Sequence, residues 1–311
     1  MKALFVGLGS IGSRHLANLV AVAGQQGLAL EVSALRAIER PLPAGIAAQV
    51  HHQLDSLPPA TQYDVAFITN PTHLHAEAIA RLKGRVGTFF IEKPIFDAPG
   101  RDLDALGLGA QQKAYVAAPM RFTALYAALK EALAALPVYA VRVLCSSYLP
   151  GWRAGADYRA SYSAHSAMGG GVTLDLIHEW DYLVDLFGLP LESCNYRGRF
   201  SALEIDSDDL SVYIARYQDF LCEVHLDYFG RSYRRTLEAF CEAGTLLADF
   251  GTGRLTLPNG TVQDHEEAPN ARYLREMAYF VRYALGGAGE SANSPRHAQA
   301  VLALALEGRH G

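Results

Sequence analysis

A glycine-rich turn near the start of the chain constrains the fold more than any other feature. Three glycines follow the spacing GxGxxG: Gly7, Gly9 and Gly12. The apolar run Ala3–Val6 precedes them, and Ser10–Val22 has apolar residues at helical spacing. Leu28–Leu35 is typical of a second strand. The motif therefore lies inside a predicted βαβ unit.

Each glycine has a separate physical role in such a turn. Gly7 permits the tight bend, Gly9 allows the backbone to approach a pyrophosphate, and Gly12 allows the helix to pack on the strand. The positive end of the helix, at Ser10 and Ile11, then faces the phosphates. The sequence predicts a dinucleotide-binding site here, whereas glycines in an ordinary turn are the alternative.

The rest of the first third continues the alternation of strands and helices. Val65–Ile68, Thr88–Ile91 and Lys113–Ala118 are nearly continuous apolar runs, which is typical of parallel strands buried on both faces. We therefore predict an α/β fold whose N-terminal domain, residues 1–119, is a Rossmann domain with a doubly wound parallel sheet. The turn after the first of these runs, Thr69-Asn70-Pro71 with His75 following, is expected to contact the cofactor near its ribose.

The pattern changes in residues 120–311. Four segments rich in β-branched and aromatic residues, with turn signals between them, are Tyr139–Tyr148, Asp209–Tyr217, Phe220–Tyr228 and Arg234–Cys241. A helix is expected over Thr173–Phe187. This second domain is therefore predicted to be α+β with a largely antiparallel open sheet that binds substrate and joins subunits.

Composition excludes several classes of protein. The 311 residues carry a formal net charge of −5 with no basic stripe, so no nucleic acid is expected as a partner. No apolar run is long enough to span a bilayer, and the four cysteines lack CxxC spacing. We expect a cytoplasmic protein with reduced thiols that binds no membrane.

The end of the second predicted strand bears on the choice of cofactor. A carboxylate is usual there, because it accepts hydrogen bonds from the adenosine ribose, but this chain has Arg36. A guanidinium pairs with a 2′-phosphate, which favours NADP(H) over NAD(H). The alternative is a solvated arginine at a strand end.

Lys93 is the leading candidate for catalysis. It follows the strand Thr88–Ile91, and the carboxyl ends of the strands in a doubly wound sheet line the ligand crevice. An amine whose pKa is lowered by desolvation or a nearby positive charge moves a hydroxyl proton. Glu92 is expected to orient the lysine at the cofactor side, and Pro94 stiffens the turn.

These motifs together resemble the Gfo/Idh/MocA oxidoreductase family, named for glucose-fructose oxidoreductase and inositol dehydrogenase. The resemblance spans nearly the whole chain and rests on four segments: Gly7–Gly12, Thr69-Asn70-Pro71 with His75, Glu92-Lys93-Pro94, and Gly169-Gly170-Gly171 leading to Asp175 and His178. It implies hydride transfer between a nicotinamide cofactor, NAD(P), and a carbinol or keto carbon of a sugar.

The resemblance also implies roles for three residues. Lys93 is catalytic or positions the substrate, while Asp175 and His178 bind the reacting hydroxyl and assist its proton transfer. Many family members place the aspartate four residues before the histidine, whereas here the spacing is three. Both spacings lie on one face of a helix, so the pair is expected to converge.

A polar, aromatic loop precedes the glycine run and resembles a subgroup associated with bacterial surface glycans. The resemblance implies a sugar or nucleotide-sugar substrate. Trp152 and Tyr158 suit stacking on a sugar, and Arg153 or Arg159 suits a phosphate or carboxylate. Arg121, at the crossing between domains, is also predicted to contact substrate. A surface loop or subunit contact is the alternative interpretation.

Other interpretations stay open at this point. A non-catalytic dinucleotide-binding sensor or regulator needs the glycine motif without Lys93, Asp175 and His178. A structural or assembly protein needs neither the glycine motif nor these three residues. HExxH spacing is missing around His178, so no metal site is predicted. An exposed antiparallel sheet predicts a homodimer or homotetramer.

Overall fold

The computed structural model describes residues 1–36, 41–134, 136–287 and 289–308. The chain divides into two compact units: the first is Met1–Pro119 with Asn270–Gln299, and the second is Met120–Pro269 with Ala300–Gly311. The division expected from the sequence, between residues 119 and 120, thus leaves out a returning segment, since Asn270–Gln299 groups with the N-terminal part.

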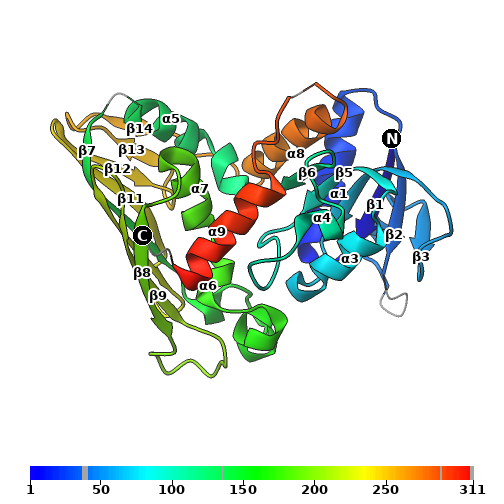
Figure 1. Ribbon diagram of the computed structural model, residues 1–311, viewed down its shortest axis with the longest axis horizontal. Helices are drawn as coiled ribbons and strands as arrows, with labels where there is room; N and C mark the ends of the chain where they lie inside the picture. Colours follow the sequence, from blue (N-terminus) through cyan, green and yellow to red (C-terminus); the bar gives the residue numbers. More distant parts are fainter. Residues whose placement is uncertain (37–40, 135, 288, 309–311) are drawn as a thin grey trace. The chain divides into compact units, whose positions relative to one another are not determined.

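A six-stranded parallel sheet forms the centre of the first unit (Figure 1). Its strands are β1 (Lys2–Val6), β2 (Glu31–Leu35), β3 (His52–Leu54), β4 (Tyr63–Ile68), β5 (Val86–Ile91) and β6 (Lys113–Val116). The order β3-β2-β1-β4-β5-β6 confirms the doubly wound fold. Ligands bind such sheets where the strand order reverses, which here is between β1 and β4.

Helices surround this sheet. They are α1 (Ser10–Gln25), α2 (Ala44–Ala47), α3 (His75–Arg81), α4 (Leu103–Leu106) and α8 (Ala271–Ala284), with a short 3₁₀ turn η1 (Thr72–Leu74) before α3. α1 packs against α8, and α3 packs against α4. The returning segment therefore supplies one of the helices that cover the sheet.

Stacked aromatic rings join the central strands to α8. The Phe5 and Phe67 rings are 4.4 Å apart, and Phe90 meets Phe280 of α8 edge-on at 5.1 Å. All four side chains are fully buried. Burial of each contributes about 1.5–3 kcal/mol relative to exposure, so α8 is part of the core of this unit.

The second unit contains an eight-stranded sheet. Its strands are β7 (Val138–Ser146), β8 (Glu192–Gly198), β9 (Leu210–Arg216), β10 (Leu221–Asp227), β11 (Arg234–Cys241), β12 (Gly244–Asp249), β13 (Arg254–Thr256) and β14 (Val262–Asp264). The order is β14-β13-β12-β11-β7-β10-β9-β8, and only the central β7–β10 pair is parallel. The predicted antiparallel character is confirmed, although β8 and β12–β14 were not anticipated because they are short or polar.

Helices cover one face of this sheet (Figure 1). They are α5 (Ala124–Leu133), α6 (Val172–Asp175) and α7 (His178–Phe187), while α9 (Pro295–Glu307) contributes to both units. Five 3₁₀ turns complete the described elements: η2 (Pro119–Phe122), η3 (Leu149–Gly151), η4 (Tyr158–Ala160), η5 (Tyr162–Ala164) and η6 (Ser166–Met168). The last four form the loop that precedes α6.

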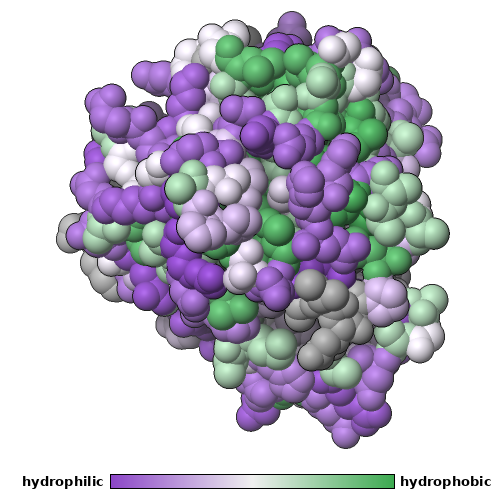
Figure 2. All heavy atoms as spheres, turned by 90° about the vertical axis from the view of Figure 1, so that its right-hand side faces the viewer, coloured by the Kyte–Doolittle hydropathy of each residue, from purple (hydrophilic) through white to green (hydrophobic). Residues whose placement is uncertain are grey.

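The visible surface has the mixed character of most folded chains. Figure 2 shows hydrophilic side chains interspersed with apolar areas on one face. Half of the sequence is hydrophobic, and folded proteins routinely leave apolar atoms exposed. None of the helices in the described ranges combines the length and apolarity needed to cross a membrane.

Candidate functional site

The glycine turn after β1 has the geometry expected of a dinucleotide cradle. Gly7 has φ +89°, and a Cβ there lies 2.9 Å from the Asn70 backbone. At Gly12 a Cβ lies 2.7 Å from the Gly7 carbonyl oxygen and 2.8 Å from Thr69 Oγ1. At Gly9, in contrast, no atom of the described residues lies within 4 Å of a Cβ. The turn is packed on two sides and open on the third.

The open side is the one that a pyrophosphate requires. Gly9 caps α1 without a side chain, so the first N–H groups of the helix, from Ser10 onward, stay accessible to an anion. Thr69 Oγ1 donates to the Gly7 carbonyl at 2.6 Å, which ties the turn after β4 to the turn after β1. The residues present therefore fit a dinucleotide at the switch point of the sheet.

Arg36 immediately follows β2. Its backbone N–H donates to Leu54, and its Nη1 lies 3.4 Å from Gln53 Oε1, so the arginine is fixed at the edge formed by β2 and β3. A cavity of about 110 Å³ adjoins the ends of β1, β2 and β4 and is lined in part by Leu35, Asn70 and Leu74. This is the edge of the sheet at which the adenosine half of a dinucleotide binds in this fold.

The turn that carries Lys93 is anchored by a buried contact between Glu92 and His15. Glu92 Oε1 lies 2.5 Å from His15 Nε2, and Glu92 Oε2 accepts the Lys93 backbone N–H at 3.1 Å. Burial raises the pKa of Glu92, but the hydrogen bond and charge of His15, together with the charge of Lys93, bring it below its ordinary value. Glu92 therefore braces the turn that carries Lys93.

His75 braces the other end of this turn. Its Nδ1 lies 3.1 Å from the Ile95 carbonyl oxygen, and its Nε2 lies 3.0 Å from the Asn70 carbonyl oxygen. A neutral imidazole has one N–H, so one of these contacts at a time is a hydrogen bond. Burial lowers the pKa of His75, although both carbonyls oppose this. His75 links the Asn70 turn to the segment after Lys93.

A second buried carboxyl group adjoins this cluster. Glu276 Oε1 accepts from the Tyr115 hydroxyl and from the Ala118 N–H, both at 2.8 Å. Burial raises the pKa of Glu276 to about 7, the charge of His15 lowers it, and the charge of Glu92 raises it. This group was absent from the sequence-based candidates, because its segment returns to the first unit only in the folded chain.

Asp175, in the second unit, is the acceptor for two phenols. Its Oδ1 accepts from Tyr162 at 2.7 Å, and its Oδ2 accepts from Tyr228 at 2.5 Å. Burial and the Asp175 charge raise the pKa of Tyr228 well above its ordinary value, so the phenol remains a donor. The two tyrosines lie 13 and 53 residues from Asp175. No spacing in the sequence indicated this arrangement.

The helix expected over Thr173–Phe187 is interrupted between Asp175 and His178. Asp175 ends α6 and His178 begins α7, and the Glu179 N–H donates to the Leu176 carbonyl three residues earlier. A 3₁₀ turn thus tightens the path at this point. The pair therefore lies on two successive helices, and the argument from one continuous helical face is wrong.

The glycine run before α6 packs closely against other residues of the second unit. A Cβ on Gly170 lies 2.2 Å from the Tyr162 carbonyl oxygen, and one on Gly171 lies 2.1 Å from Asp208 Oδ1. Asp208 also accepts from the backbone N–H and the hydroxyl of Thr173. These glycines therefore close the loop onto α6.

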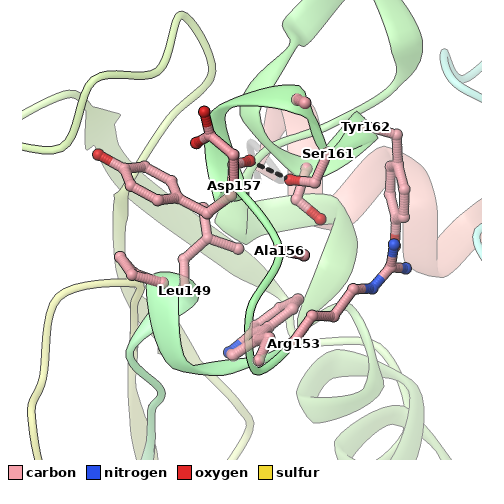
Figure 3. Close-up of a pocket in the computed structure, with 11 residues that line it drawn as sticks. Leu149, Arg153, Ala156, Asp157, Ser161 and Tyr162 are labelled. Atoms are coloured by element: carbon pink, nitrogen blue, oxygen red, sulfur yellow. Dashed lines mark hydrogen bonds between the residues drawn. The ribbon is translucent and has the colours of Figure 1, made fainter.

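The loop of 3₁₀ turns encloses a pocket of about 260 Å³ (Figure 3). Trp152, Arg153 and Tyr158 line it. Trp152 Nε1 donates to Ser147 Oγ at 2.7 Å, and its ring meets that of Tyr228 edge-on. Two of the predicted substrate residues, Trp152 and Tyr158, thus lie at one pocket.

Arg159 does not line this pocket. Its guanidinium binds both oxygens of Asp157 and also Glu204 Oε2 at 3.0 Å. These carboxylates pair with the cation within the loop, and the contact of Arg159 with substrate stays a prediction. Arg153 takes its place at the pocket wall, and no ion pair involves it in the described part of the chain.

Arg121 is likewise occupied by the fold. Its Nε donates to Asp181 Oδ2 at 2.8 Å and its Nη1 to Asp185 Oδ1 at 2.9 Å, with the side chain 6% exposed. Asp185 also accepts from Lys130 at 2.7 Å and from the Tyr126 hydroxyl. The predicted contact with substrate is therefore corrected to a buried tie between η2, α5 and α7.

The candidate residues group by unit. The first unit brings together the glycine turn, the Thr69-Asn70-Pro71 turn and the Glu92-Lys93 turn at the carboxyl ends of β1, β4 and β5. The second unit brings together Asp175 and the loop pocket through Tyr162, which lines the pocket. Among the residues that the structure describes, no group of three or more histidine, cysteine or acidic side chains is arranged to hold a metal ion.

Residues 1–117 match the profile of the Gfo/Idh/MocA family, which is described as an oxidoreductase family with an NAD-binding Rossmann fold. Among curated proteins no sequence matches the chain. The matched range includes the glycine turn, Thr69, His75 and Lys93.

Solved structures of low sequence identity share the fold along nearly the whole chain. Levoglucosan dehydrogenase in complex with NADH and levoglucosan has a TM-score of 0.79 at 16% identity, covering 98% of this chain and 95% of its own. The WlbA dehydrogenase from Bordetella pertussis, in complex with NADH and UDP-GlcNAcA, has 0.75 at 18%, covering 98% and 94%. GenD2 from gentamicin A biosynthesis, in complex with NAD, has 0.77 at 19%, covering 98% and 92%.

Proposed function

We propose that the protein is an NAD(P)-dependent dehydrogenase or reductase, because its residues 1–117 match the Gfo/Idh/MocA oxidoreductase family with its NAD-binding Rossmann fold. It transfers a hydride between the nicotinamide and a carbinol or keto carbon of a sugar or nucleotide sugar. One observation carries this proposal: Lys93 lies at the carboxyl end of β5, two strands from the open glycine turn after β1. The amine and the coenzyme cradle thus share one edge of one sheet.

The chain's own residues position the substrate and move its proton. When bound, the coenzyme accepts or supplies the hydride at C4 of its nicotinamide. Lys93 takes the hydroxyl proton in the oxidative direction and returns it in the reductive direction, assisted by His178. Asp175, already an acceptor for two phenols, orients the sugar hydroxyls rather than acting as a strong base. Most of the rate enhancement in this scheme comes from positioning.

The coenzyme is proposed to be NADP(H). Arg36 lies at the end of β2, where its guanidinium suits a 2′-phosphate. Arg36→Asp is expected to weaken NADPH binding by about tenfold or more, ~1.4 kcal/mol, and to favour NADH. Isothermal titration with both coenzymes checks this, and an unchanged ratio of dissociation constants would remove Arg36 from coenzyme selection.

The substrate is proposed to be a sugar with an anionic substituent, such as a nucleotide sugar. Trp152 and Tyr158 supply aromatic surface at the loop pocket, and Arg153 supplies a cation. Two structures that share the fold hold levoglucosan and UDP-GlcNAcA. These observations support a sugar as the substrate, and Arg153 at the pocket supports a sugar that carries a negative charge.

Turnover of the Lys93→Met variant tests the mechanism. The parent is first titrated with NADPH by fluorescence and then assayed at the NADPH absorbance band against sugars and nucleotide sugars. Lys93→Met is expected to lower kcat by about 10²–10⁴-fold while coenzyme affinity is retained. Lys83→Met, at an exposed lysine that contacts the carbonyls of Asp104 and Ala105, is the matched control. Near-normal turnover of Lys93→Met would exclude the lysine.

A non-catalytic sensor is the second candidate, since the glycine turn alone suffices for binding coenzyme. It predicts NADPH binding without turnover on any sugar. In that case, Lys93→Met leaves every measured property of the protein unchanged.

Assembly through the second sheet is also proposed. Tyr196, Ile214 and Leu221 lie on one face of β8–β10 and are 76%, 43% and 49% exposed. Covering these side chains in a homodimer or homotetramer removes apolar surface from water. Light scattering of the parent and of Ile214→Lys checks the assembly, and a monomeric parent would contradict it.

A further inference from the structure

The turn that carries Lys93 is held at both ends by buried histidines from different helices. His15 of α1 contacts Glu92, immediately before the lysine, and His75 of α3 contacts Ile95, two residues after it. Both histidines are essentially inaccessible, at 0% and 1% exposure. Lys93 itself is half-buried. The segment between the two anchors is therefore short and its ends are fixed.

Each histidine also belongs to a helix that follows one of the two turns proposed to bind the coenzyme. These turns, Gly7–Gly12 and Thr69-Asn70-Pro71, are called the coenzyme loops below. His15 lies on α1, three residues after Gly12, so the helix that begins at the pyrophosphate cradle also contacts Glu92. His75 begins α3 and contacts the Asn70 carbonyl, which lies in the turn packed against Gly7. Two rigid paths thus run from the coenzyme loops to the lysine turn.

The His15 path depends on a specific ring atom. Nε2 faces Glu92 Oε1, while Nδ1 is buried with no partner among the described residues. The groups around the ring are Glu92, Glu276, and the Phe90 and Tyr273 rings, at 4.7 and 6.3 Å. An unpaired buried carboxylate is costly, so the Nε2 contact holds Oε1 of Glu92 in place, while Oε2 accepts the Lys93 backbone N–H.

We propose that His15 and His75 are positioning residues for Lys93, and that they transmit occupancy of the coenzyme loops to this lysine. The inference rests on the proposed function, because it assigns a purpose to the placement of that amine. Neither histidine touches substrate in this scheme. Each acts through the turn, His15 through Glu92 and His75 through the backbone of Ile95.

Side-chain mimics separate the two ring nitrogens of His15. The amide nitrogen of His15→Gln reaches the position of Nε2, whereas that of His15→Asn reaches only the position of Nδ1. The acylation rate of Lys93 by acetic anhydride, measured by mass spectrometry, is compared with the rates of four exposed lysines: Lys2, Lys83, Lys113 and Lys130. His52→Gln, at a 54% exposed histidine that pairs with Glu31, is the control variant.

The coenzyme-free protein tests the anchoring. His15→Asn is expected to raise the relative acylation rate of Lys93 by about threefold or more, because a loosened turn exposes the amine, whereas His15→Gln and His52→Gln leave it unchanged. His75→Leu is expected to raise it like His15→Asn. Equal rates in His15→Asn, His15→Gln and the parent would overturn the anchoring, and loss of fold in all His15 variants alike would do the same.

ADP-ribose tests the transmission, because it has the pyrophosphate and adenosine but lacks the nicotinamide ring that would shield Lys93 directly. Saturating ADP-ribose is expected to lower the Lys93 acylation rate in the parent and in His15→Gln, but not in His15→Asn. Binding without any effect in the parent would overturn transmission. If neither ADP-ribose nor ADP-ribose 2′-phosphate, the fragment that matches NADP(H), binds at all, both the proposed function and the transmission are wrong, whereas the coenzyme-free comparison still decides the anchoring.

Turnover gives an independent readout once a substrate is known. His15→Asn is expected to lower kcat by about 10²-fold, as a misplacement of about 1 Å does, with KM and coenzyme affinity close to those of the parent. His15→Gln restores most of kcat. A purely structural role predicts instead that Gln and Asn lower kcat together with thermal stability.

Discussion

At the scale of single residues, the glycine turn shows how three glycines acquire different roles from their surroundings. Gly7 and Gly12 face backbone and side-chain atoms at less than 3 Å from a Cβ, while Gly9 faces open space. Gly7 also has a positive φ that other residues rarely adopt. Substitution therefore separates folding from ligand binding within one motif.

Alanine at Gly12 and at Gly9 should have opposite effects. Gly12→Ala is expected to destabilise the protein by about 1–3 kcal/mol, because its Cβ meets backbone. Gly9→Ala leaves the stability unchanged and weakens NADPH binding by at least about tenfold, ~1.4 kcal/mol. Urea denaturation and fluorescence titration measure the two effects. A Gly9→Ala protein that binds coenzyme normally would contradict the assignment of this open side.

Glu276 gives a pH dependence with a defined sign. Burial raises its pKa to about 7 in the folded protein, against 4.5 for an ordinary glutamate. Between these two values the folded state binds more protons than the unfolded state, so this group makes stability fall as pH rises from about 4.5 to 7. The full effect is on the order of 3 kcal/mol.

Glu276→Gln removes this dependence. The difference in unfolding free energy between Glu276→Gln and the parent is expected to shift in favour of the variant as pH rises from 5 to 8. Urea titrations at both values measure it. A difference that stays constant with pH would show that Glu276 does not titrate in this range.

At the scale of elements, buried ion pairs decide how helices lie on the second sheet. Arg121 of η2 binds two aspartates of α7, and Asp185 also binds Tyr126 and Lys130 of α5. The exposed pair Arg159–Asp157 lies within one loop and joins no two helices. Arg121 and Arg159 both lie near a loop in the sequence, but only Arg121 is expected to contribute much to the stability of the fold.

Loss of Arg121 tests this difference. Arg121→Leu is expected to cost about 3–5 kcal/mol, because it leaves the buried Asp181 without its cation, whereas Asp185 keeps Lys130. Arg159→Leu should leave the urea midpoint close to that of the parent. Both variants are expected to bind NADPH normally, since their residues belong to the second unit. Equal midpoints for the two variants would contradict the role of Arg121.

At the scale of the whole molecule, the first unit is assembled from two separate segments. Asn270–Gln299 supplies α8, whose Phe280 packs on Phe67 and Phe90, and Glu276, which accepts from Tyr115. Asn293 also donates to the Val116 carbonyl at 3.1 Å. The first unit is therefore incomplete until residues 270–299 are present.

Residues 1–119 alone are expected not to unfold cooperatively, because removal of α8 exposes the aromatic face of the sheet to water. A chain that joins 1–119 to 270–299 through a flexible linker should unfold cooperatively and bind NADPH. Circular dichroism and fluorescence titration check both. Cooperative unfolding of 1–119 at the temperature of the full chain would contradict this division.

The sequence by itself determined the local features of the protein. The spacing of Gly7, Gly9 and Gly12, the apolar runs of β1, β4 and β5, and the turns ending in Lys93 and Asn70 follow from short-range patterning, which is legible along the chain. The alternating strands β9–β11 were legible for the same reason. The polar strand β8 and the three-residue strand β13 were not, because neither has an apolar period of sufficient length.

Only the tertiary structure decided which of these features act together. Asp175 accepts hydrogen bonds from Tyr162 and Tyr228. The turn that carries Lys93 contacts His15 and His75. Arg121 and Arg159 pair with carboxylates that their sequence spacing does not predict. The physical reason is that hydrogen bonds and ion pairs depend on distances of about 3 Å in space. Those distances are set by packing between segments that are far apart in the chain.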